Sequence, residues 1–469
     1  MAGAAHPRWL LALACSAQFM VVLDVTIVNV ALPSLRDELE LSTRGLHWVV
    51  SAYAVAFGGF LLVGGRVADA LGRRRILVAG ALLFTAASLA CGLAPSGAVL
   101  VGSRAVQGLG AALLSPAAFG LLVASFDEGR ERTRAIAVWG SIGSLGAVTG
   151  LAAGGILTEL LGWRAVFLVN VPVGLALVGL APVLLPASRA TRRTPVDLTG
   201  AMLATAGVAA LAYLLSNGAA LGWRSPSSAG AAVVAVAALT LFALRQGRAL
   251  HPLVPAGFLR NGRFIGAGTV GLLHGAAMLG MLLLLAVYLQ EGRGFSPLQA
   301  GIVLLLLRGP AVGWARLVGR LVGRFGPEPF LVLGSALMAT GLLFLTQLPA
   351  DGPLATSLVP GLAVLGLAIP CLFVSVNAAA LGRVDPEQAA LGSGMLSTLQ
   401  WMGGALGLAL VAALARDPAA GADAPRSAVV ESVHTGFLAC GLLGVLALAL
   451  AVGVALAPRL RAAPAPASG

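Results

Sequence analysis

The chain has 469 residues, of which 58% are hydrophobic and only 10% are charged, and its mean hydropathy is +0.95. This balance excludes an ordinary soluble globular domain, because about 25% of the residues in such domains are charged. The formal net charge of +12 does not indicate nucleic-acid binding, because the arginines cluster in short segments between apolar runs and no nucleic-acid-binding motif is present. We therefore expect the lipid bilayer, and not nucleic acid, to be a partner.

Apolar runs of about 20 residues recur along the whole chain, and each can cross a hydrocarbon core of roughly 30 Å as a helix. The sequence thus predicts an all-α polytopic membrane protein with about fourteen transmembrane helices. The expected spans are residues 9–33, 47–66, 76–94, 99–126, 135–161, 164–186, 196–217, 228–244, 264–290, 298–317, 329–348, 354–381, 389–416 and 435–456.

The distribution of arginine predicts the orientation of these spans. An even number of spans puts both termini on one side, and 21 of the 30 Arg residues then fall on that side, against 7 on the other. Because loops on the cytoplasmic side carry the excess of basic residues, both termini are expected in the cytoplasm. All basic residues are Arg, in a chain rich in Ala, Gly and Pro, which is typical of a GC-rich bacterial genome and indicates a bacterial inner membrane.

One internal repeat is visible. The stretch "GRVADALGRRRILVAG" from Gly65 matches "GRLVGRFGPEPFLVLG" from Gly319, 254 residues later. Repeated halves are typical of transporter folds. The repeat predicts a six-helix bundle in residues 1–188, two inserted helices with flanking cytoplasmic loops in 189–262, and a second six-helix bundle in 263–469.

The loop after the second span carries an acid within a block of Arg. Gly65, Asp69, Gly72, Arg73 and Arg74 fill a signature that resembles the major facilitator superfamily. A simple basic anchor at the membrane surface is the alternative reading of the Arg block. The resemblance implies a fold of two six-helix bundles, with these five residues forming a cytoplasmic latch between the bundles.

Two further motifs narrow the resemblance. "LDVTIVNVALP" from Leu23 and "RAVQGLGAA" from Arg104 are similar to first-span and fourth-span motifs of the fourteen-span drug:proton antiporter family. The resemblance covers essentially the whole chain. It implies two extra helices between the bundles and export of a small lipophilic compound against protons.

Asp24 is a lone carboxylate in the apolar run "FMVVLDVTIVNVALP". Charged residues at this depth are costly and usually mark ion or proton pathways, so we expect Asp24 to carry the proton. The alternative is a neutral Asp24 bonded to Gln18, Thr26 or Asn29. The resemblance gives Arg104 a role in proton coupling, and a structural Arg bonded to helix-end carbonyls is its alternative.

The fifth span, "GSIGSLGAVTGLAAGGIL", presents a face without side chains at Gly146, Gly150, Gly154 and Gly155. The resemblance implies an antiporter-type Gly helix, whereas close packing of small residues is the plainer reading. The family normally has Gly-Pro here and this chain has Leu151, which leaves antiport and uniport both open.

Five residues in the spans are candidates to line a substrate cavity: Gln18, Asn29, Met278, Arg308 and Trp401. Arg308 lies deep in the tenth span, where a lipid-facing Arg is costly, so we expect it to face the cavity and to disfavour permanent cations. In the alternative, it snorkels or bonds backbone. Packing within the core is the ordinary role of Met and Trp.

Three other titratable residues receive no role in coupling. Glu159 and Glu291 lie near the outer ends of their spans and are expected to be solvated rim residues. His274 lies deep in the ninth span, where a single His is usually a satisfied core residue.

These features predict a secondary transporter, not an enzyme, that exports lipophilic drugs or antibiotics by alternating access. No phosphate-binding loop or metal-ligand spacing is present, so we expect no cofactor and no metal, with the proton gradient as the driving force. A dedicated exporter of one endogenous metabolite, a non-transporting membrane sensor and an intramembrane enzyme are the alternatives. The sequence leaves the oligomeric state open.

Overall fold

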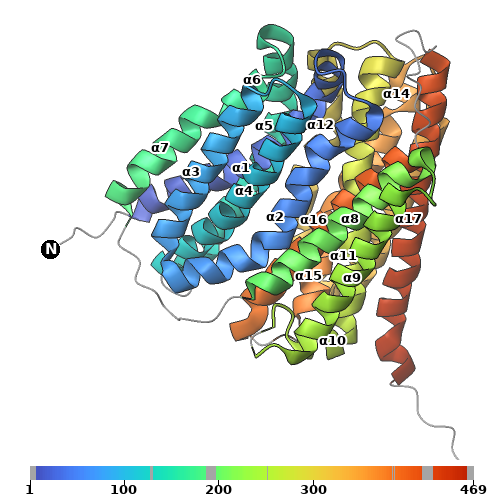
Figure 1. The fold of residues 1–469 in the computed structure, drawn as a ribbon. Coiled ribbons are helices and arrows are strands. Elements are labelled where there is room, and N and C mark those ends of the chain that lie inside the picture. Colours follow the sequence, from blue (N-terminus) through green and yellow to red (C-terminus); the bar gives the residue numbers. More distant parts are fainter. Residues whose placement is uncertain are drawn as a thin grey trace, which may run out of the picture.

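A computed structural model describes residues 7–126, 130–185, 197–250, 252–382, 384, 386–414 and 426–461. Within these residues all regular secondary structure is helical, and the axes of most helices are roughly aligned with one another (Figure 1). Thirteen of the described helices are long and apolar enough to cross a membrane. The predicted all-α polytopic class is confirmed.

The N-terminal bundle holds the first six predicted spans. Its helices are α1 (Pro7–Glu38), α2 (Thr43–Leu71), α3 (Arg73–Gly92), α4 (Gly97–Ser125), α5 (Arg130–Leu161), α6 (Ala165–Leu168) and α7 (Asn170–Leu184). The sixth span is thus divided into a short helix and a longer one. Helix α4 packs against both α2 and α3, and α1 packs along α5.

Two inserted helices, α8 (Leu198–Leu221) and α9 (Pro226–Arg248), form a hairpin that packs against α2 and α16. Asp197 caps the N-terminus of α8 by accepting a hydrogen bond from the Gly200 N–H at 2.9 Å. The same carboxylate accepts hydrogen bonds from Arg245 at 2.6 Å and Gln246 at 3.1 Å, both near the end of α9. One buried carboxylate therefore ties the two ends of the hairpin together.

The C-terminal bundle contains the remaining spans. Its helices are α10 (Ala256–Arg260), α11 (Gly262–Val287), η1 (Tyr288–Gly292), α12 (Pro297–Phe325), α13 (Glu328–Phe344), η2 (Leu345–Gln347), α14 (Leu354–Ser357), α15 (Val359–Leu381), α16 (Pro386–Leu414) and α17 (Arg426–Arg461). The predicted tenth span lies in α12, where the described apolar part, Pro297–Leu307, is shorter than the other spans. The predicted domain boundaries stay a prediction.

The repeated motif forms the same turn in both bundles. Gly72 separates α2 from α3 with φ at 100°, and Gly326 separates α12 from α13 with φ at 84°. Only glycine adopts these angles without strain, so the matched glycines of the repeat occupy matched backbone positions.

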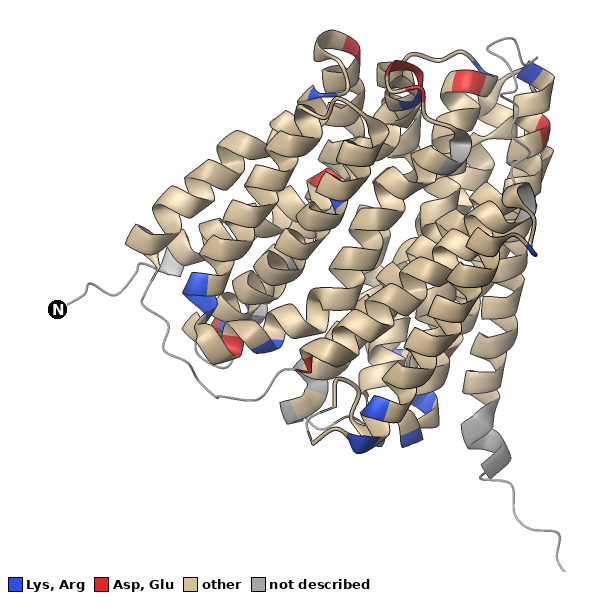
Figure 2. Ribbon diagram, viewed as in Figure 1, with Lys and Arg blue, Asp and Glu red and all other residues tan. Residues whose placement is uncertain are grey.

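Charged residues lie mainly at the two ends of the helices, and basic residues gather at the lower end in Figure 2. We call this the Arg-rich end; it includes the end of α2 with Arg66, the start of α3 with Arg73 and Arg74, and the end of α9 with Arg245. At the opposite end, the two bundles meet through backbone. A Cβ on Gly155 of α5 would lie 2.7 Å from the Leu298 Cα of α12, and a Cβ on Gly301 would lie 2.5 Å from the Leu151 carbonyl oxygen.

Candidate functional site

Asp24 and Arg104 form an ion pair in the interior of the N-terminal bundle. Asp24 is in the middle of α1 and Arg104 is in the first half of α4, and their side chains are 0% and 1% exposed. The Arg104 Nη1 donates to the Asp24 Oδ2 at 2.6 Å. The two residues that the sequence assigns to proton coupling are therefore in direct contact.

Two neutral side chains hold the second oxygen of Asp24. Its Oδ1 accepts a hydrogen bond from Gln107 Nε2 at 2.8 Å and another from Asn170 Nδ2 at 2.9 Å. Gln107 also donates to the Ser88 Oγ at 2.6 Å. Helices α3, α4 and α7 thus all contribute to the surroundings of the carboxylate on α1. Arg104, Gln107 and Asn170 therefore all donate hydrogen bonds to the oxygens of Asp24.

Arg104 is held as tightly as Asp24. Its Nε donates to the Val49 carbonyl of α2 at 2.9 Å, and its Nη1 also donates to Gln107 Oε1 at 2.7 Å. The guanidinium carbon lies 4.4 Å from the centre of the Tyr53 ring and 5.7 Å from that of Phe167. Removing one partner from such a buried pair typically costs about 3–5 kcal/mol, because the other charge stays buried.

The three side chains that could have bonded a neutral Asp24, namely Gln18, Thr26 and Asn29, bond to other groups instead. Thr26 and Asn29 donate to backbone carbonyls of the preceding turn of α1, and Gln18 accepts a hydrogen bond from Ser115 at 3.2 Å. Besides Arg104, the side chains that do contact Asp24 are Gln107 and Asn170, which were not predicted from the sequence. Both are polar residues inside apolar runs, which is the same signal that singled out Asp24.

The glycine face of α5 contacts α1. A Cβ on Gly150 would lie 1.9 Å from the Thr26 Oγ1, one on Gly154 would lie 2.7 Å from the Ile27 carbonyl oxygen, and one on Gly146 would lie 3.1 Å from a backbone oxygen of α1. The glycines therefore let α1, which carries Asp24, approach α5 closely. This is the packing role of small residues in membrane helices.

The predicted latch residues lie where α2 turns into α3. Arg73 donates to Asp69 Oδ1 at 2.8 Å and to the Gly120 carbonyl of α4 at 2.6 Å. Arg74 donates to the Leu185 carbonyl at 2.9 Å. These partners all belong to the N-terminal bundle, so a latch between the two bundles stays a prediction.

The cavity candidates are dispersed. Trp401 of α16 packs against Tyr53 and Phe57 of α2, with ring centres 6.2 and 5.0 Å apart. Met278 is half-buried against a hydrophobic core to which both bundles contribute. The backbone of Arg308 is in α12, and its side chain lies outside the described residues.

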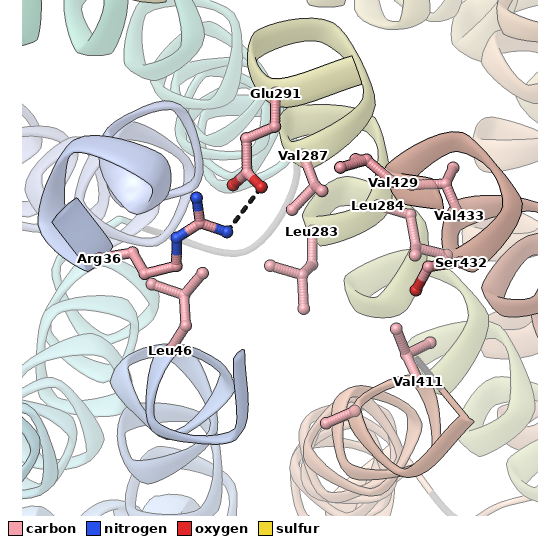
Figure 3. Close-up of a pocket in the computed structure, with 11 residues that line it drawn as sticks. Arg36, Leu46, Leu283, Leu284, Val287, Glu291, Val411, Val429, Ser432 and Val433 are labelled. Atoms are coloured by element: carbon pink, nitrogen blue, oxygen red, sulfur yellow. Dashed lines mark hydrogen bonds and ion pairs between the residues drawn. The ribbon is translucent and has the colours of Figure 1, made fainter. Parts of the chain in front are cut away.

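At the opposite end, Arg36 of α1 and Glu291 of η1 connect the bundles (Figure 3). The Arg36 Nη1 lies 2.6 Å from the Glu291 Oε2, and Gln290 donates to the Val30 carbonyl at 2.8 Å. The expectation that Glu291 is a solvated rim residue is wrong, because its side chain is only 13% exposed. Glu159 is exposed, as expected.

A small, mainly apolar cavity of about 40 Å³ lies beside this ion pair. Besides Arg36 and Glu291, it is lined by Leu46, Leu283, Leu284, Val287, Val411, Ala412, Val429, Ser432 and Val433. The lining comes from both bundles, so a rearrangement of the bundles changes its shape.

Known protein sequences are similar to this chain over most of its length. Residues 14–408 match the family described as the Major Facilitator Superfamily. The chain belongs to this superfamily. It is therefore a multi-pass membrane transporter and not an enzyme.

Several curated superfamily members are similar over most of their length. The puromycin resistance protein pur8 of Streptomyces alboniger is 40% identical over 462 residues, which cover 96% of this chain and 89% of that protein. The lincomycin resistance protein of Streptomyces lincolnensis is 37% identical, covering 95% and 92%. The cephamycin export protein CmcT of Amycolatopsis lactamdurans is 34% identical, covering 96% and 92%.

Solved structures of superfamily transporters share the fold. A crystal structure of the peptide transporter POT in complex with sulfate has a TM-score of 0.71 at 18% identity, covering 97% of this chain and 95% of that one. A crystal structure of a variant of the nucleoside transporter NupG has a TM-score of 0.68 at 11% identity, covering 96% and 100%. At these identities the likeness supports the fold alone.

Proposed function

We propose that this chain exports antibiotics or other lipophilic drugs from a bacterial cytoplasm in exchange for protons. The observation that carries the proposal is the buried Asp24–Arg104 pair, because a buried carboxylate with a fixed cationic partner can exist in two protonation states of different geometry. Relatives named for puromycin, lincomycin and cephamycin support the class of substrate.

The proposed cycle uses the two bundles as rigid bodies. The close approach of Gly155 and Gly301 to the other bundle and the Arg36–Glu291 ion pair support a structure closed at the opposite end, which on this proposal faces the outside. The Arg-rich end and both termini then face the cytoplasm of the plasma membrane. Export requires these outer contacts to break while contacts at the Arg-rich end form.

Proton entry supplies the energy. In the outward-open state Asp24 takes up a proton, which removes its charge and weakens its bond to Arg104. In the inward-open state Asp24 loses the proton and the ion pair forms again. One charge moved across 100 mV is worth about 2.3 kcal/mol, which drives the drug outward.

The test is Asp24→Asn in proteoliposomes with an imposed pH gradient and a panel of radiolabelled antibiotics. The amide keeps the shape of the side chain but cannot exchange a proton, so we expect loss of uphill export. Drug binding measured by calorimetry should persist. Asp351→Asn, at an exposed carboxylate, is the matched control and should transport normally. Undiminished uphill export by Asp24→Asn would refute proton coupling through this residue.

A dedicated exporter of one compound is the second candidate. The names of three relatives, each referring to one antibiotic or antibiotic class, favour it. The relative named multidrug resistance protein Stp, from Mycobacterium tuberculosis, favours a broad specificity instead. Resistance profiles of a pump-deficient host that expresses this chain would separate the two, because a dedicated exporter protects against one structural class only.

A further inference from the structure

Tyr53 lies between the ion pair and the other bundle. Its side chain is 1% exposed, and the guanidinium carbon of Arg104 is 4.4 Å from the centre of its ring. The same ring packs against Trp401 of α16 in an edge-on arrangement, with ring centres 6.2 Å apart and planes at 67°. One aromatic ring therefore contacts both the Asp24–Arg104 site and the C-terminal bundle.

Close backbone packing keeps this ring in place. A Cβ on Gly108 of α4 would lie 2.5 Å from the Tyr53 carbonyl oxygen, so α4 and α2 pack closely there. A Cβ on Gly58 of α2 would lie 2.8 Å from the Trp401 Cβ, so α2 and α16 also touch one turn further along. Because interiors packed this tightly do not deform continuously, a shift of the guanidinium displaces the ring.

The strength of the contact between Arg104 and the ring depends on Asp24. A cation over an aromatic face is attracted by the ring electrons, and the attraction is stronger where both groups are desolvated, as they are here. An ionised Asp24 draws the guanidinium toward α1, whereas a protonated Asp24 leaves the Tyr53 face, the Val49 carbonyl and the Gln107 Oε1 as its main partners. Proton binding thus changes the force that Arg104 exerts on Tyr53.

The charged and titratable groups around Asp24 are few among the described residues. They are Arg104 from α4, Tyr53 from α2 and Cys91 from α3, and the contact from α7 is the neutral Asn170. We propose that Tyr53 is a positioning residue that transmits the protonation state of the Asp24–Arg104 pair to Trp401 and so to the C-terminal bundle. This inference rests on the proposed role of Asp24 as the proton carrier.

The hydroxyl group of Tyr53 provides a clean control. It is buried and has no hydrogen-bond partner among the residues that the structure describes, so Tyr53→Phe breaks none of the described bonds while it keeps the aromatic face. Tyr53→Leu and Tyr53→Met remove the face and keep an apolar side chain. Phe57→Leu, one turn further on α2, removes a ring that contacts Trp401 but has no described contact with Arg104.

The experiment measures coupling and transport separately in reconstituted protein. Drug-induced proton release in detergent and the pH profile of uphill export report coupling, and downhill flux reports transport. Tyr53→Leu should reduce uphill accumulation about tenfold and flatten the pH profile, while downhill flux stays within about threefold. Tyr53→Phe should keep the parent's pH profile and proton release, and Phe57→Leu should alter drug affinity without changing the pH profile. Tyr53→Met replaces Tyr53→Leu if that protein does not give a monodisperse peak on size exclusion.

Two results would overturn the proposal. One is an unchanged pH profile and proton release in Tyr53→Leu or Tyr53→Met. The other is an equal loss in Tyr53→Phe, which would assign the role to the hydroxyl group instead of the ring. Asp24→Asn measured alongside keeps the two proposals apart: if it retains uphill export, the proton carrier is wrongly assigned, and if it alone loses export, only the role of Tyr53 fails.

Discussion

Gly301→Ala tests whether the contact between α5 and α12 holds the bundles together at the opposite end. The added Cβ would lie 2.5 Å from the Leu151 carbonyl oxygen, whereas ordinary contacts begin at 3.4 Å. The two backbones must therefore separate by about 0.9 Å, and overpacking of this kind costs about 1–3 kcal/mol. A state in which this end is open does not incur that cost, so its population relative to the present state should rise about 5- to 150-fold.

The assay is the rate at which a membrane-impermeant thiol reagent labels Ser432→Cys, in protein whose four native cysteines are replaced. Ser432 lines the small cavity between the bundles at this end. Gly319→Ala is the matched control, because it is on the same helix and its Cβ would meet no atom within 4 Å. Equal labelling rates in Gly301→Ala and Gly319→Ala, both with the parent's thermal stability, would refute the reasoning.

Three other substitutions have defined outcomes. Asp69→Asn should change the rates at which thiol reagents label cysteines introduced at the Arg-rich end and at the opposite end, while drug affinity is kept; unchanged labelling with normal transport would contradict a latch. Glu291→Gln should favour the state open at the opposite end by about 1–3 kcal/mol, because the neutral amide pairs weakly with Arg36, and the double variant Arg36→Glu, Glu291→Arg should restore the parent's labelling. Burial works to raise the pKa of Asp197, but its hydrogen bonds, above all that from Arg245, outweigh burial and lower it. The ionised Asp197 therefore stabilises the fold above about pH 4, and this contribution is lost as pH falls through its lowered folded-state pKa. Asp197→Ala should reduce the free energy of unfolding by about 1 kcal/mol near pH 7 and by little at low pH. Thermal melts recorded across this pH range measure the difference.

The turn at Gly72 shows what kind of information the sequence carries about the fold. The apolar runs predict the spans because a helix is the structure that satisfies its own backbone in lipid, whatever its neighbours are. The repeat of Gly72 at Gly326 likewise depends on local backbone angles, and the structure has positive φ at both. Such features are local, so a linear pattern is sufficient to predict them.

Asp24 shows where this information ends. Its position in an apolar run marks it as unusual, and the motif around Arg104 points to the same function, but neither says that the two side chains are 2.6 Å apart. Gln107 and Asn170 are 83 and 146 residues away along the chain from Asp24, and only the packing of α4 and α7 around α1 brings them to its carboxylate.

The prediction that Glu291 is a solvated rim residue fails for the same reason. Its place near the end of an apolar run indicates a solvated residue, and in an isolated helix it would be one. In the folded protein the partner that buries it is Arg36 of the other bundle, 255 residues away along the chain. The sequence by itself determined which segments cross the membrane and which residue types are costly there. The tertiary structure decided which of those costly groups meet, because burial and ion pairing depend on helices that are distant in sequence and adjacent only after the bundles have packed.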